Sequence, residues 1–120
     1  MKSIYSNIYV YQGADFTKSF QILEDTTDPF SLEGFVLKGQ IRKTWSSSVA
    51  YDIDLFVDDP QSGVIEILVS SEETLKMKPG RYLYDVYGES TESDGRTFKF
   101  IEGILTLEPR ITRLEEGVED

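Results

Sequence analysis

Two aspartates lie two positions apart in a segment where acidic and hydrophobic residues alternate. A β-strand here would place the carboxylates of Asp52 and Asp54 on one face, opposite Ile53 and Leu55. Paired carboxylates can act as general acid and base or hold a metal ion. That chemistry requires a pocket and two unequal environments, and the surrounding sequence indicates neither. We therefore expect a solvated strand face with no catalytic role.

Other residues that carry chemistry are missing or poorly placed. The sequence has no histidine and no cysteine, which removes the commonest proton shuttle and the usual zinc ligands. The serines at 46–48 therefore have no histidine to activate them as nucleophiles. The acidic loops 24–28 and 58–63 lack the EF-hand spacing, and aspartate is common in turns. We predict no enzyme, cofactor or metal site, and leave calcium binding by an acidic loop open.

The charge of the chain excludes some partners. The 120 residues include 12 Lys and Arg against 22 Asp and Glu, which gives a net charge of -10. A polyanion such as nucleic acid, or an acidic membrane surface, is therefore not an expected partner. No run of about 20 apolar residues is present to span a bilayer. The beginning, "MKSIYSNIYVYQG", has no long apolar core, and we expect mature protein there.

The hydrophobic residues recur mainly with a period of two, which predicts about seven short antiparallel strands. The segments are 4–12, 15–23, 35–43, 50–57, 64–69, 81–87 and 97–107. Within "SSEETLKMK", early acids and late lysines predict one short helical turn near 72–77. We expect an all-β, immunoglobulin-like β-sandwich as a single domain over residues 1–113, followed by an acidic C-terminal tail at 114–120.

The segment "GRYLYDVY" is expected to serve the core. Alternation places Tyr82 and Tyr84 on one face, directly after a Pro-Gly turn. In immunoglobulin-like folds a tyrosine at this corner bonds to nearby backbone. We predict that both tyrosines are buried, with Gly39 as one candidate for a small partner in the opposing sheet, and that Tyr87 is more exposed.

A row of tyrosines near the beginning predicts an interface. Tyr5, Tyr9 and Tyr11 share one face of segment 4–12, and aliphatic residues occupy the other face. An N-terminal strand is usually an edge strand, and an apolar edge needs cover. Trp45 follows the third segment and is either an interface anchor or a half-buried strand end. The candidate interface residues are Tyr5, Tyr9, Tyr11 and Trp45.

Several short motifs occur in an order that resembles a known family. They are Gln40 to Lys43, Ser46 to Ala50, Gly63, Thr74 to Val86, and the ending from Glu102-Gly103 through Pro109 to Thr112-Arg113. Together they resemble the N-terminal domain of the baseplate upper proteins of tailed bacteriophages, over roughly residues 15–113.

That resemblance implies a small β-sandwich that binds other virion proteins and is not an enzyme. We therefore expect a structural or accessory protein of a bacteriophage virion, made in the host cytoplasm and docked on tail, baseplate or head proteins. Self-association within the virion is also expected. Because this sequence closes soon after the resembling region, we expect an accessory or capsid decoration role. The alternative is a carbohydrate-binding module on the host-facing side, with Tyr and Trp as stacking platforms.

Overall fold

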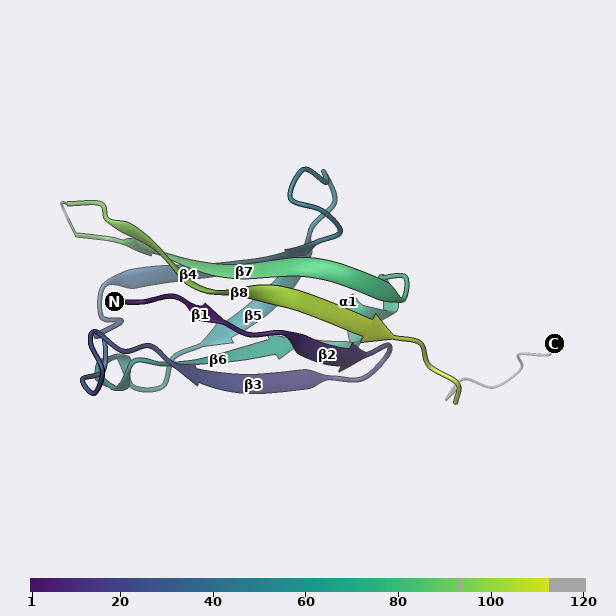
Figure 1. Ribbon diagram of the computed structural model, residues 1–120, viewed down its shortest axis with the longest axis horizontal. Helices are drawn as coiled ribbons and strands as arrows, with labels where there is room; N and C mark the ends of the chain where they lie inside the picture. The colour runs from purple at the N-terminus through teal and green to yellow at the C-terminus, as the bar shows by residue number, and fades with distance from the viewer. Residues whose placement is uncertain (93, 113–120) are drawn as a thin grey trace.

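The computed structural model describes residues 1–92 and 94–112, and within them it has eight strands, one 3-10 helix and one short α-helix (Figure 1). The all-β class predicted from the sequence is confirmed. The acidic tail at 114–120 lies outside the described residues. The elements are β1 (Ile4–Tyr5), β2 (Ile8–Tyr11), β3 (Phe16–Gln21), β4 (Phe35–Arg42), β5 (Tyr51–Phe56), η1 (Pro60–Ser62), β6 (Val64–Val69), α1 (Ser71–Leu75), β7 (Gly80–Ser90) and β8 (Thr97–Glu108).

The strands form one curled sheet in the order β1-β8-β7-β4-β5-β6-β3, and β2 also pairs with β8. The first half of β5 pairs with β4, whereas the second half, from Asp54, pairs with β6. β5 therefore passes from one layer to the other, and Figure 1 shows it crossing between β4-β7-β8 and β3-β6. The buried aliphatic and aromatic side chains fill the space between these layers.

The first strand corrects the sequence prediction. Segment 4–12 was predicted as one antiparallel strand, but it is divided into β1 and β2, and both run parallel to β8. The interruption falls at Ser6 and Asn7. There the Ile104 N–H donates to the Asn7 side-chain oxygen at 3.0 Å, and the Tyr84 hydroxyl donates to the Ser6 carbonyl at 2.5 Å. Side-chain groups thus replace ladder bonds at this point, which ends the regular pairing.

A glycine makes the interruption possible. A Cβ atom on Gly103 would overlap the Ser6 carbonyl oxygen and would also lie 3.1 Å from the Tyr84 ring. Only a residue without a side chain lets the first strand approach β8 this closely. We call this group of Ser6, Tyr84 and Gly103 the Tyr84 node.

A β-bulge divides the β7–β8 hairpin. Val86 faces Ile101, whereas Tyr87 faces Lys99, so Phe100 is the extra residue. Phe100 and Ile101 are therefore both fully buried although they are adjacent. The phase of β8 changes at this point, so inward positions are even-numbered before it and odd-numbered after it.

Four phenylalanines close one end of the core. Their ring centroids lie 5.7–6.2 Å apart in tilted or edge-on arrangements. Gly88 leaves room for one of these rings, because a Cβ atom there would overlap Phe100. The cluster consists of Phe30, Phe35, Phe98 and Phe100.

The predicted burial of the two tyrosines is confirmed. Tyr82 and Tyr84 are 5% and 3% exposed, and Tyr87 is 40% exposed. The prediction for Gly39 is wrong, because β4 and β7 are neighbours in one layer and Gly39 faces Val86 there. The small partner of Tyr84 is Gly103, which pairs with it across β7 and β8.

We predict that Tyr84→Phe lowers the free energy of unfolding by about 0.5–1.5 kcal/mol, because the part-buried Ser6 carbonyl loses its hydrogen-bond donor. Burial raises the pKa of Tyr84 from 10.0 to about 12. The folded state thus favours the neutral phenol. The contribution of Tyr84 to the free energy of unfolding is therefore complete below the unfolded pKa and is lost as pH rises from 10 to 12. Urea unfolding of parent and variant over this range measures the effect. If the free energy of unfolding falls equally in the parent and in Tyr84→Phe above pH 10, the prediction is wrong.

We predict that Gly103→Ala costs about 1–3 kcal/mol or more, because the added methyl group must displace the Ser6 backbone. Thr106→Ala, on the outer side of the same strand, is the control and should cost less than about 1 kcal/mol. Thermal unfolding of the three chains compares them. If Gly103→Ala and the parent unfold at the same temperature, the approach of β1 to β8 is not constrained at Gly103.

Candidate functional site

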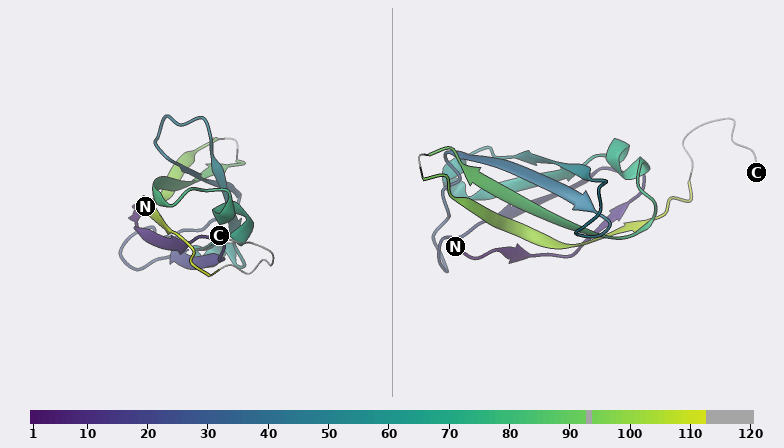
Figure 2. Two further views of the ribbon diagram at one scale, coloured as in Figure 1. Left: turned by 90° about the vertical axis from the view of Figure 1, so that its right-hand side faces the viewer. Right: turned by 90° about the horizontal axis from the view of Figure 1, so that it is seen from above.

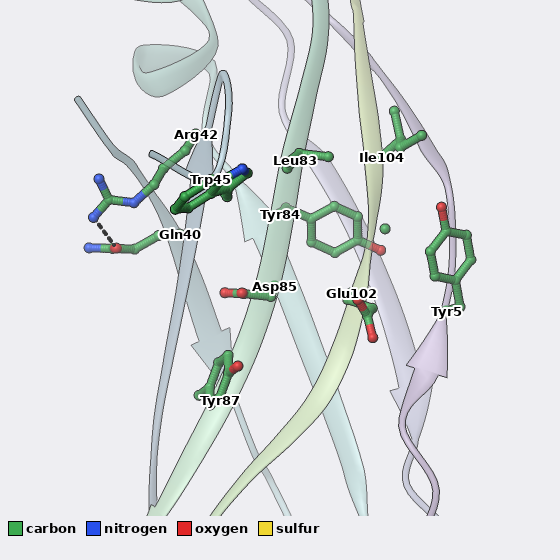
Figure 3. A pocket seen from close by; sticks show the side chains of 11 residues that line it. Tyr5, Gln40, Arg42, Trp45, Leu83, Tyr84, Asp85, Tyr87, Glu102 and Ile104 are labelled. Atoms are coloured by element: carbon green, nitrogen blue, oxygen red, sulfur yellow. Dashed lines mark hydrogen bonds between the residues drawn. The ribbon is translucent and has the colours of Figure 1, made fainter. Parts of the chain in front are cut away.

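The outer face of the β4-β7-β8 layer contains a hollow of about 570 Å³ (Figure 3). Its floor is formed by the three strands, and its walls come from β1 and from the loop between β4 and β5. We call it the aromatic hollow. Its aromatic and aliphatic lining includes Tyr5, Trp45, Leu83, Tyr87 and Ile104.

Two of the predicted interface residues meet in this hollow and two do not. Tyr5 and Trp45 line it from opposite walls, and Trp45 is 86% exposed. Trp45 is therefore not half-buried, and its role as an interface anchor stays a prediction. Tyr9 and Tyr11 lie further along β2 and do not line the hollow.

The loop that carries Trp45 is held by hydrogen bonds to Ser47. Arg42 donates from its guanidinium to the Ser47 carbonyl at 2.5 Å, and the Thr44 N–H donates to the Ser47 hydroxyl at 3.0 Å. The Ser47 N–H in turn donates to the Thr44 carbonyl at 3.1 Å. Figure 1 shows this loop standing out from the sheet. The serine-rich turn therefore fixes the base of an exposed tryptophan.

A row of polar side chains crosses the floor of the hollow. Gln40, Asp85 and Glu102 are register partners on β4, β7 and β8. Like charges directly opposite each other on a sheet destabilise it by about 0.2–1 kcal/mol. Burial raises the pKa of Asp85, with Glu102 raising it further and Lys99 and Arg42 lowering it.

The β-bulge supplies one of the balancing cations. In a regular strand, residues three positions apart face opposite sides. The bulge instead lets Lys99 reach Glu102 on the outer side at 3.3 Å. Arg42 lies on β4 and donates to the Gln40 side-chain oxygen at 3.0 Å. The floor therefore combines two carboxylates with one cation and an amide, and Lys99 pairs with Glu102 from outside the lining.

The second candidate surface is the outer edge formed by β1 and β2. Tyr5, Tyr9 and Tyr11 are 63%, 60% and 59% exposed, whereas Ile8 and Val10 are buried. Within the described residues, β1 and β2 pair with β8 alone, so their other edge has no strand partner. Figure 2 shows β1 and β2 beside β8 at the border of the layer. We call this row of Tyr5, Tyr9 and Tyr11 the tyrosine edge.

The aspartate pair that opened the sequence analysis lies elsewhere. Asp52 and Asp54 are exposed on β5 while Ile53 between them is buried, as predicted. In the described part of the chain, no group of three or more acidic residues is placed to hold a metal ion. No helix in that part is long and apolar enough to span a bilayer.

Leu83 and Asp85 line the hollow from β7 together with Tyr87, but the sequence did not assign these three residues to a site. The signal was present in the alternation of "GRYLYDVY", whose outer positions hold hydrophobic side chains on either side of one carboxylate. What could not be read was the position of Tyr5 and Trp45 next to them, because these come from distant elements.

Comparisons with known proteins do not assign the chain to a family. No family model and no curated protein matches the chain. Among solved structures, it is similar to an internalin-like protein of Listeria monocytogenes, with 14% sequence identity and a TM-score of 0.47. The match covers 88% of this chain and 28% of that protein, so the chain spans little more than a quarter of its length.

Proposed function

We propose that this chain is a non-enzymatic structural or accessory protein of a bacteriophage virion, and that it docks on other tail, baseplate or head proteins. The observation that carries the proposal is the tyrosine edge, three exposed aromatic side chains on β1 and β2, whose outer edge has no strand partner within the described residues. Such an edge is suited to accept a strand of another protein, while the tyrosines supply contact area. The motifs that resemble baseplate upper proteins support the same function.

We also propose that the fold belongs to the immunoglobulin-like sandwiches. The neighbours β3-β6-β5 correspond to strands B, E and D of that fold, and β4-β7-β8 correspond to C, F and G. The Tyr82 hydroxyl donates to the Lys78 carbonyl at 2.6 Å, as a tyrosine corner does at the start of strand F. Both the strand order and the tyrosine corner support the immunoglobulin-like assignment.

Several residues of the resembling motifs have structural roles. Thr74 is fully buried, and its hydroxyl accepts a hydrogen bond from the Gly13 N–H at 2.8 Å. Tyr84 and Gly103 form the Tyr84 node with Ser6. These three residues therefore serve the fold, and the tyrosine edge lies on residues outside the motifs. Virion location and self-association through the same edge remain parts of the proposal.

We predict that Tyr9→Ser/Tyr11→Ser reduces incorporation into virions by about tenfold or more, because central aromatic contacts dominate interface energies. Phe56→Ser is the control, since Phe56 is an exposed aromatic residue of β5 far from the edge in strand order. Particles assembled with tagged parent, variant or control are purified by density gradient, and the tag is measured in each.

Each result of this experiment has a distinct meaning. Absence of the tagged parent from purified particles contradicts the virion function. Incorporation of the double variant at the level of Phe56→Ser contradicts docking through the tyrosine edge.

A further inference from the structure

We infer that the aromatic hollow is a binding site for a neutral oligosaccharide. The inference goes beyond the docking function and does not depend on it, because the tyrosine edge and the hollow share only Tyr5. A volume of about 570 Å³ falls within the usual range of ligand sites and has room for about two sugar rings.

The aromatic lining provides flat surfaces at separate points of the hollow. Figure 3 shows Trp45 and Tyr87 on either side of Asp85, with Tyr5 across the hollow. Sugar rings have apolar faces of C–H groups, which pack on aromatic rings, and hydroxyl groups at their edges. An exposed tryptophan gains from such cover, because its large apolar area is otherwise left in water.

The charges on the polar floor determine which net charge of a ligand is favoured. Asp85 and Glu102 are balanced by Arg42 in the lining and by Lys99, which lies outside the lining but pairs with Glu102, so neither a cation nor an anion has a net electrostatic advantage. The floor nevertheless offers both donors and acceptors. A hydroxyl group can donate to a carboxylate and accept from an amide or guanidinium, so a polyhydroxylated neutral molecule fits this combination.

The site is held in place before any ligand arrives. Arg42 donates both to Gln40 on the floor and to the Ser47 carbonyl in the loop that carries Trp45. One guanidinium thus connects the polar floor to the aromatic wall. Binding then orders few groups, which lowers its entropic cost.

Trp45 is the single tryptophan of the chain, so its fluorescence reports on this hollow alone. The probes are neutral tetrasaccharides of glucose, galactose, mannose and N-acetylglucosamine, each titrated to about 10 mM. We expect a saturable blue shift of the emission with at least one of them. Tyr87→Ala and Asp85→Asn should each weaken that binding by about tenfold.

Control variants distinguish a loss of sugar binding from unfolding and from a loss of docking. Tyr9→Ser/Tyr11→Ser should leave sugar affinity unchanged, and circular dichroism confirms that each variant is folded. The inference is overturned if no tetrasaccharide gives a saturable shift. It is also overturned if folded Tyr87→Ala and Asp85→Asn bind as the parent does, or if an anionic sugar such as sialyllactose binds more tightly than every neutral one.

Discussion

The hydrogen bond from the Tyr84 hydroxyl to the Ser6 carbonyl connects β7 to the junction between β1 and β2, 78 residues earlier in the chain. It requires Gly103, whose missing side chain lets the first strand lie against β8. The bond also lies in the floor of the aromatic hollow, because Tyr84 and Gly103 both line it. The position of β1, and with it the position of Tyr5 at the wall, therefore depends on an interaction in the core. Stability and surface shape are coupled at this point.

β7 serves both sides of its layer at once. Its inward residues fill the core, and its outward residues Leu83, Asp85 and Tyr87 form part of the hollow. The bulge opposite this strand changes the phase of β8, so the core receives two adjacent large side chains and the outer face receives Lys99 and Glu102 together. A single extra residue thus sets both the packing inside and the charge balance outside.

The sequence predicted local features well and spatial relations less well. Alternation placed the strands within a few residues and correctly buried Tyr82 and Tyr84, because side-chain direction depends only on period. It could not reveal the parallel direction of β1 and β2, since that depends on a partner about a hundred residues away. Gly39 was misplaced for the same reason. The bulge left one local trace, the adjacent hydrophobic residues Phe100 and Ile101. The exposed tyrosines of the first segment were identified from the sequence. That Tyr5 lines the hollow whereas Tyr9 and Tyr11 lie only on the edge was not predicted.

The pairing of the first strand with β8 also governs the order in which the chain can fold. Ile4 finds its partner in Ile101, so this ladder cannot form during synthesis until nearly the whole domain has left the ribosome. Closing such a long loop costs conformational entropy before the distant contacts can stabilise the chain. Folds rich in distant pairings are therefore slow to form. Until that step, the side of β8 that receives β1 and β2 is an open strand edge, and Tyr84 has no acceptor for its hydroxyl. While that edge is open it can pair with other chains, and docking of the first strand ends that exposure.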